Sequence, residues 1–340
     1  MKNKRNKILV DAFLECIPET KRLVGILMDI LDLNKESVYR RLRSEVPFTF
    51  DEIYIIAHHL GISLDRIIGV GNKETVPFDF HMHKSTDPVS IYSEILNMNL
   101  GLFAKVNGAS TARVDLILNR LPFAYTLPFE NLAKFYYYKW YYHTQNVPSN
   151  FYFKDFVVPE QIKEIQKKHV DDNAILGCDI TILMDNNLFL SMIKEINYFV
   201  NRGLITESEQ TQFQRELLQC VDLIENVAKN GVNKGGVTIN TYISAVDLEP
   251  NYVYIEYDDK ACIHYWTSSA EIFSSCDTEM CERQKVWIQS LKRYTTLITR
   301  CNAHWRTEYF DKQRMYVRKK LSPSANQPDN QVITEEPLST

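Results

Sequence analysis

The side chains best suited to chemistry lie between Asn34 and Glu45, a segment that reads Asn-Lys-Glu-Ser-Val-Tyr-Arg-Arg-Leu-Arg-Ser-Glu. As a helix, this segment would direct Val38, Tyr39 and Leu42 towards a core. Its other faces would then expose a mainly basic set of polar side chains: Lys35, Glu36, Ser37, Arg40, Arg41 and Arg43. Arginine can fork onto guanine or pair with phosphate, and serine reaches base edges or backbone, so this set favours reading of the DNA major groove.

Five short helices are predicted in the first 70 residues and would position this segment. They cover residues 4–16, 20–31, 35–44, 50–60 and 63–69, where apolar residues recur at spacings of three and four. Thr20, Asn34, Thr49 and Ser63 stand where helix N-caps are expected, and Gly61 where a C-cap is expected. The pattern predicts a small all-α domain over residues 1–70.

Together these helices resemble the Cro/cI-type (lambda-repressor-like, XRE-type) helix-turn-helix domain over about residues 5–70. Two stretches carry the resemblance, Pro47-Phe48-Thr49-Phe50-Asp51-Glu52-Ile53 and Ile56-Ala57-His58-His59-Leu60-Gly61-Ile62-Ser63-Leu64-Asp65. They are similar to the fourth helix, the glycine-centred turn and the serine-capped fifth helix of that family. In the family, the helix matching residues 35–44 enters the major groove, and the start of the helix matching residues 20–31 lies against the phosphate backbone.

The resemblance therefore implies two sets of DNA contacts. Base-facing positions match Lys35, Glu36, Ser37, Arg40 and Arg41. Phosphate-facing positions match Thr20, Lys21, Arg22 and Arg43. Residues 1–70 hold 11 Lys and Arg against 10 Asp and Glu, so affinity must come from local clustering, and a single copy should bind modestly and in a salt-sensitive way.

A larger, mainly α domain with a small antiparallel sheet is predicted after a linker at residues 71–88. Residues 89–230 are mostly helical by pattern, and three adjacent β-forming runs at 237–244, 252–257 and 261–266 predict an antiparallel meander. A long helix over residues 279–320 would close this domain (residues 89–320). The polar, proline-containing tail at 321–340 is expected to be disordered. The fold class is thus mainly α, with an α+β second domain.

An aromatic run from Phe135 to Tyr142 has two interpretations. A buried core is favoured, because such rings bury large areas, and a ring-lined ligand pocket is the alternative. This run and residues 159–165 also make the chain similar to a group of uncharacterised bacterial regulators of comparable length, which implies no particular ligand.

Motifs for catalysis or metal binding do not emerge from the sequence. The His81-Met82-His83 triplet lacks neighbouring ligands, and Cys276 and Cys281 are not spaced as a zinc knuckle or redox pair. An odd number of cysteines, seven, favours reduced thiols in a cytoplasm over a disulfide framework. We therefore predict no enzyme, no metal and no cofactor.

These observations predict a cytoplasmic bacterial transcriptional regulator that binds double-stranded DNA as a homodimer, with no membrane segment. Alternatives are a protein-interaction module that uses the helical head, or an enzyme with a site in the aromatic-rich domain. A small-molecule effector is left open. The predicted dimer seam is a heptad-spaced stripe on the closing helix: Trp287, Leu291, Tyr294, Ile298, Cys301 and Trp305.

Overall fold

The structure, a computed structural model, describes residues 2–64, 76–80, 83, 85–174, 177–233, 236–267 and 271–322. The chain divides into two compact units, Met1–Pro77 and Phe78–Thr340, which we call the head and the second unit. Within the described ranges, no helix is both long and apolar enough to cross a membrane.

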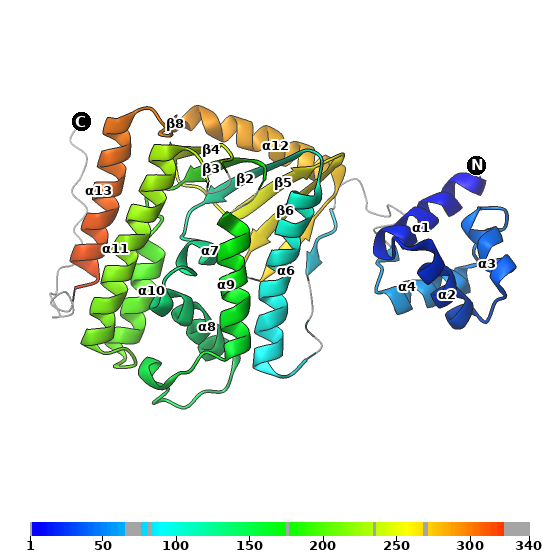
Figure 1. Ribbon diagram of the computed structural model, residues 1–340, viewed down its shortest axis with the longest axis horizontal. Helices are drawn as coiled ribbons and strands as arrows, with labels where there is room; N and C mark the ends of the chain where they lie inside the picture. Colours follow the sequence, from blue (N-terminus) through cyan, green and yellow to red (C-terminus); the bar gives the residue numbers. More distant parts are fainter. Residues whose placement is uncertain are drawn as a thin grey trace, which may run out of the picture. The chain divides into compact units, whose positions relative to one another are not determined.

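The head contains four described helices around one small core (Figure 1). They are α1 (Lys2–Cys16), α2 (Thr20–Leu31), α3 (Lys35–Leu42) and α4 (Phe50–Leu60). The buried apolar side chains of this core come from every helix and the loop before α4: Val10, Phe13, Leu23, Val24, Leu27, Val38, Phe48 and Ile56. The four helices predicted over this range are confirmed, whereas most of the fifth (residues 63–69) lies outside the described residues.

An eight-stranded mixed sheet organises the second unit. Its strands are β1 (Asp79–Phe80), β2 (Ala112–Leu118), β3 (Asp179–Met184), β4 (Ile239–Ser244), β5 (Tyr252–Tyr257), β6 (Lys260–Trp266), β7 (Ile272–Ser275) and β8 (Thr295–Leu297). They follow the spatial order β1-β7-β6-β5-β2-β3-β4-β8. The pairs β2–β3 and β3–β4 are parallel, and all other pairs are antiparallel.

Helices cover both faces of the sheet, which gives three layers (Figure 1). The helices are α6 (Pro88–Gly108), α7 (Phe123–Thr126), α8 (Glu130–Thr144), α9 (Glu160–Ala174), α10 (Leu190–Asn201), α11 (Glu207–Asn230), α12 (Thr278–Leu291) and α13 (Ala303–Lys320), with 3-10 turns η1 (Phe153–Asp155) and η2 (Lys292–Tyr294). Helix α12 lies alone on one face, and the other helices gather on the opposite face.

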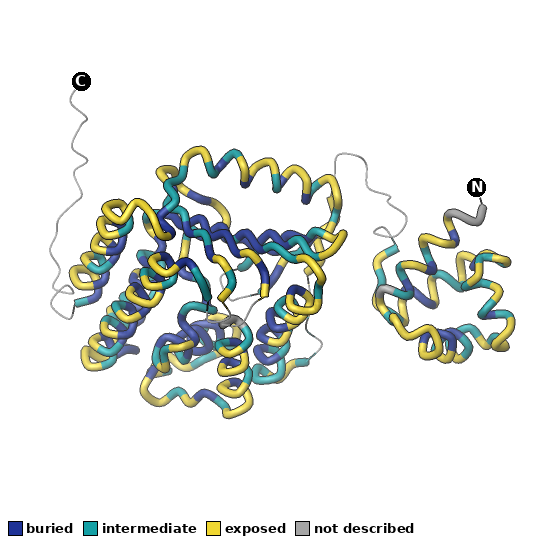
Figure 2. Tube along the Cα trace, turned by 45° about the horizontal axis from the view of Figure 1, so that its top comes forward, coloured by how far each residue is buried: buried dark blue, intermediate teal, exposed yellow. Residues whose placement is uncertain are grey.

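Strand alternation separates two apolar cores in this unit. Along β2, Val114 and Leu118 face the large helical layer, whereas Ile117 faces α12. Figure 2 shows the sheet as a buried band between layers whose outer sides are exposed. The aromatic run Phe135–Tyr142 lies on α8 in the larger core, where Phe135, Tyr137, Tyr138 and Trp140 are each at most 2% exposed. The favoured core interpretation of this run is therefore confirmed for most of its rings.

The sheet is larger than the predicted small antiparallel meander and is not purely antiparallel. The β5–β6 hairpin is confirmed, with Asp258 at its turn in a left-handed conformation (φ 51°). Strand β4 does not join that hairpin, because β2 and β3 lie between β4 and β5. Those two strands fall in the range predicted to be mostly helical, and β1 falls within the predicted linker at 71–88.

The long closing helix predicted over 279–320 is wrong. Helix α12 ends at Leu291, and η2 and β8 precede α13. The β-branched run from Thr295 pairs with β4, and positive φ angles at Arg300 (56°) and Asn302 (47°) turn the chain before α13 begins. The heptad-spaced residues therefore lie on different elements, and the predicted dimer seam does not exist as one helical stripe.

A disulfide joins Cys262, on β6, to Cys276, directly after β7. The preceding register pair, Ile263 and Ser275, already brings these antiparallel strands together, so the two cysteines meet across the hairpin. The prediction of free thiols is wrong for this pair.

Candidate nucleic-acid interface

Helices α2 and α3 form a helix-turn-helix, joined by the three residues 32–34. Asp32 ends α2 in the left-handed conformation (φ 51°, ψ 45°), which reverses the chain direction within the turn. Asn34 then caps α3, because its side-chain oxygen accepts a hydrogen bond from the Ser37 backbone N–H at 2.9 Å. A short turn between packed helices is the geometry of DNA-binding helix-turn-helix units.

The inner face of α3 is apolar, as the sequence predicts. Val38 is fully buried, and Tyr39 and Leu42 are half-buried against the same core. This packing fixes which side of α3 points outward. The outward set is Lys35, Glu36, Arg40 and Arg43, which are exposed, and Ser37, which is half-buried.

The ion pairs on the outer face of α3 are exposed to solvent. Arg43 lies 3.0 Å from Glu36 and 3.1 Å from Glu45, and Arg40 lies 3.6 Å from Glu45. The side chains of Arg40 and Arg43 are 53% and 55% exposed. Solvent-exposed pairs of this kind contribute little stability, so both guanidinium groups can exchange these partners for a phosphate or a base at small cost.

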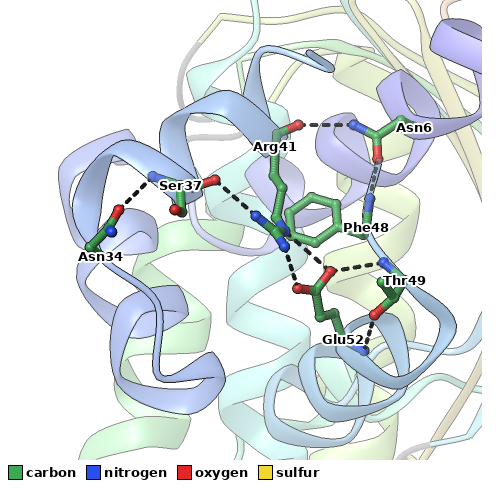
Figure 3. A network of polar contacts seen from close by, with 7 residues as sticks. All are labelled: Asn6, Asn34, Ser37, Arg41, Phe48, Thr49 and Glu52. Atoms are coloured by element: carbon green, nitrogen blue, oxygen red, sulfur yellow. Dashed lines mark hydrogen bonds and ion pairs between the residues drawn. The ribbon is translucent and has the colours of Figure 1, made fainter. Parts of the chain in front are cut away.

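Arg41 lies on a different face from the one that the resemblance implies (Figure 3). Its Nε donates to Glu52 Oε2 at 3.1 Å, a terminal nitrogen lies 2.7 Å from Glu52 Oε1, and another donates to the Ser37 carbonyl at 3.3 Å. The Arg41 and Glu52 side chains are only 16% and 15% exposed. Arg41 therefore ties α3 to α4, and the expectation that it stands on the exposed face is wrong.

Glu52 also caps its own helix. Its carboxylate accepts a hydrogen bond from the Thr49 N–H at 2.8 Å, and Thr49 Oγ1 accepts one from the Glu52 N–H at 3.2 Å, which completes a capping box. Burial alone would raise the pKa of Glu52, but its hydrogen bonds and charge pairing with Arg41 and its bonds to Thr49 outweigh burial and lower it. The carboxylate stays ionised where both partners need it.

Asn6 supplies a third tie (Figure 3). Only 4% exposed, it donates from Nδ2 to the Arg41 carbonyl at 2.9 Å and to Ser44 Oγ at 3.0 Å, and it accepts from the Phe48 N–H at 3.0 Å. One amide thus joins α1 to both ends of the segment between α3 and α4. Asn6, Arg41 and Glu52 together form what we call the polar clamp.

The sequence signals only part of this clamp. The spacing of Thr49 and Glu52 matches a capping box and could have been recognised. Nothing local marks Asn6, whose partners lie 35 to 42 residues away.

The predicted phosphate contacts of α2 lie at its first turn. Thr20, Lys21 and Arg22 are exposed there. The N-cap is Glu19, not the predicted Thr20, and its side chain makes no capping hydrogen bond. The first turn therefore offers backbone N–H groups beside two cations, a combination that suits an anion.

No family model, no curated protein and no solved structure matches this chain. The functional interpretation therefore depends on the geometry of the chain itself.

Proposed function

We propose that this protein is a sequence-specific DNA-binding transcriptional regulator of the Cro/cI type, with α3 as its reading helix. The observation that carries the proposal is the α2–turn–α3 unit, whose second helix buries Val38 and leaves Lys35 and Arg40 on the outside. An exposed basic face on the second helix of such a unit is what entry into the major groove requires.

Each outward side chain of α3 has a role that fits its chemistry. Arg40 is long and exposed enough to fork onto a guanine, and Lys35 and Ser37 stand at the end of the helix that enters the groove first. Glu36 can accept a hydrogen bond from a cytosine amino group once Arg43 leaves it for a phosphate. Arg41 acts through the fold, because it holds α3 against α4.

Phosphate contacts from α2 would fix the register of the head on the duplex. Lys21 and Arg22 supply charge, and the first-turn N–H groups and the Thr20 hydroxyl supply directed donors. Such contacts carry no sequence information themselves, but they orient the reading helix.

A homodimer completes this proposal. One head makes few phosphate contacts, and proteins of this class bind paired half-sites one or more helical turns apart. A two-fold dimer would supply the second head and match a two-fold-symmetric operator. The broken helical seam leaves the dimer surface to be sought elsewhere in the protein.

The test is selection of bound sequences from a random duplex pool with the full chain, followed by affinity measurements on the selected site at several salt concentrations. Affinity should fall steeply with salt, because bound phosphates release counterions. Arg40→Ala should weaken binding to the selected site by about 1–3 kcal/mol, which is roughly 5- to 160-fold in affinity.

The matched control is Arg215→Ala, an exposed arginine on α11 in the second unit, which should bind like the wild type. Enrichment of no sequence, or an Arg40→Ala affinity equal to wild type on the selected site, would contradict the proposal. DNA binding whose affinity does not change with salt concentration would instead favour a head that binds another protein.

A further inference from the structure

The sheet of the second unit changes character between β2 and β5. On one side β2, β3 and β4 run parallel, and on the other β5, β6 and β7 are antiparallel. The carboxyl end of β2, the start of β5 and the end of β6 meet at one edge, because Ile117 pairs with Tyr252, which in turn pairs with Tyr265. In open α/β sheets, ligands bind at the carboxyl edge of the strands where the strand order changes.

A small cavity lies at this edge. Its volume is about 30 Å³, and its walls include charged and aromatic residues from the segment after β2, from α7, from α8, from α10 and from the end of β6: Arg120, Phe123, Tyr136, Lys139, Glu195 and Trp266. Since a buried water needs about 10–15 Å³ of such space, the cavity matches two or three waters or one small carboxylate anion.

Lys139 is the buried cation of this cavity. The residue is 5% exposed, its Nζ lies 2.8 Å from Glu195 Oε2, and it stands 4.5 Å from the ring centroid of Tyr136. Tyr136 is held in turn by a hydrogen bond from its hydroxyl to the Leu121 carbonyl at 2.8 Å. An ammonium group has three donors, so Lys139 keeps two N–H groups for further acceptors after Glu195 takes one.

Arg120 is the second cation, and its backbone is fixed. Asn251, 6% exposed, accepts hydrogen bonds from the N–H groups of Asn119 (2.6 Å) and Arg120 (3.2 Å) and donates to the Arg120 carbonyl (3.1 Å). Arg120 is exposed and is one of the residues that line the cavity. Because Lys139 and Glu195 cancel, the charge of the lining is that of Arg120, +1.

We propose that this cavity binds a small monocarboxylate, with its carboxylate between Arg120 and Lys139 and its short carbon chain against Phe123 and Trp266. A monoanion balances the charge of the lining, and charge-assisted hydrogen bonds from two cations are stronger than those between neutral groups. Thr267 adds a hydroxyl at the wall whose oxygen is buried and lacks a hydrogen-bond partner among the described residues. The site lies in the second unit and does not depend on DNA binding by the head.

Strand pairing connects the cavity to the first strand of the second unit. Trp266 ends β6, β6 pairs with β7, and β7 pairs with β1, the strand at residues 79–80 that opens the unit. A ligand against Trp266 therefore contacts the β6–β7 hairpin, and β1, the first strand of the second unit, pairs with that hairpin.

The test is a titration of the full chain with sodium propionate, followed by protein NMR or calorimetry at constant ionic strength. Propionamide is the neutral isostere, and sodium chloride controls for salt. We expect saturable propionate binding that Arg120→Gln weakens by about tenfold or more, as loss of a charge-assisted hydrogen bond would. The matched variant Arg215→Gln should bind propionate like the wild type.

A second variant tests the cavity by shape. Ser191→Phe adds a ring at the cavity wall and should abolish propionate binding while Arg120 is intact. Absence of saturable binding to the wild type, equal binding of propionamide, or equal affinity in Arg120→Gln would each overturn the proposal. None of these outcomes bears on DNA binding by the head, so the two proposals fail separately.

Discussion

Different kinds of contact hold the helices of the head and those of the second unit in place. Among the described residues, the core of the head gathers eight buried apolar side chains, and the polar clamp of Asn6, Arg41 and Glu52 supplements it. Over the same described ranges, the larger core of the second unit gathers 45 buried residues, many of them aromatic and in mutual contact. Small domains bury a smaller share of their surface, so directed polar contacts count for more in the head.

The largest expected effect is a matched pair of core truncations. Phe13→Ala and Phe135→Ala each remove a fully buried ring and should each cost about 3–5 kcal/mol. That loss is comparable to the whole stability of a domain as small as the head, whereas the second unit should remain folded. Hydrogen exchange on the full chain should therefore show complete loss of protection in α1–α4 for the first variant only. Native protection of the head in Phe13→Ala would show that the polar clamp contributes more to the stability of the head than its apolar core does.

A smaller effect separates two adjacent arginines. Arg41→Ala removes a largely buried pair with Glu52 and should destabilise the head by about 1–3 kcal/mol. Arg40→Ala, on the exposed face, should change stability by less than about 0.5 kcal/mol. Exchange protection of α3 and α4 amides in each variant measures the difference. Equal protection in the two variants would show that the Arg41–Glu52 pair does not stabilise the head.

The smallest expected effect is the pH dependence that Glu52 gives to the stability of the head. The pKa of Glu52 is lower in the folded head than its usual value of 4.5, so its stabilising contribution is fully present above that value and is lost as pH falls through the lowered pKa. Exchange protection of α4, corrected for the intrinsic rate, should therefore decline below about pH 4.5. Glu52→Gln should be less stable at neutral pH and should lack this part of the acid response. An unchanged acid response in that variant would assign the effect to other carboxylates.

Local signals made the head predictable from the sequence. Helices α2, α3 and α4 begin and end within about two residues of their predicted bounds, because Asn34, Thr49 and Gly61 act as caps where their residue types suggest. Six of the nine predicted DNA-contacting residues are exposed on α2 and α3 (Thr20, Lys21, Arg22, Lys35, Glu36 and Arg40), and Arg43 is exposed at the end of α3. Arg41 was misplaced, since helical spacing alone does not show that a carboxylate on α4 will bind it.

The features of the second unit that the sequence did not predict depend on contacts between distant parts of the chain. Strands β2 and β3 lie inside the sheet between two helical layers, so they form short apolar runs without clear alternation and resemble buried helix. The predicted helical stripe has Tyr294 directly before β8 and Ile298 directly after it, but the pairing of β8 with β4 makes this stretch extended. The cavity at Arg120 joins residues from distant parts of the chain, which no local pattern brings together.

The division of labour on α3 has a consequence for how this protein can evolve. The contacts that hold α3 use the Arg41 side chain and the backbone atoms of Ser37 and Arg41, whereas Lys35 and Arg40 take no part in the clamp. Outward residues can therefore be exchanged at little cost in stability, because substitutions on an exposed face usually change it by less than about 0.5 kcal/mol. The outer face of α3 can therefore change one residue at a time while the contacts that hold the helix stay the same.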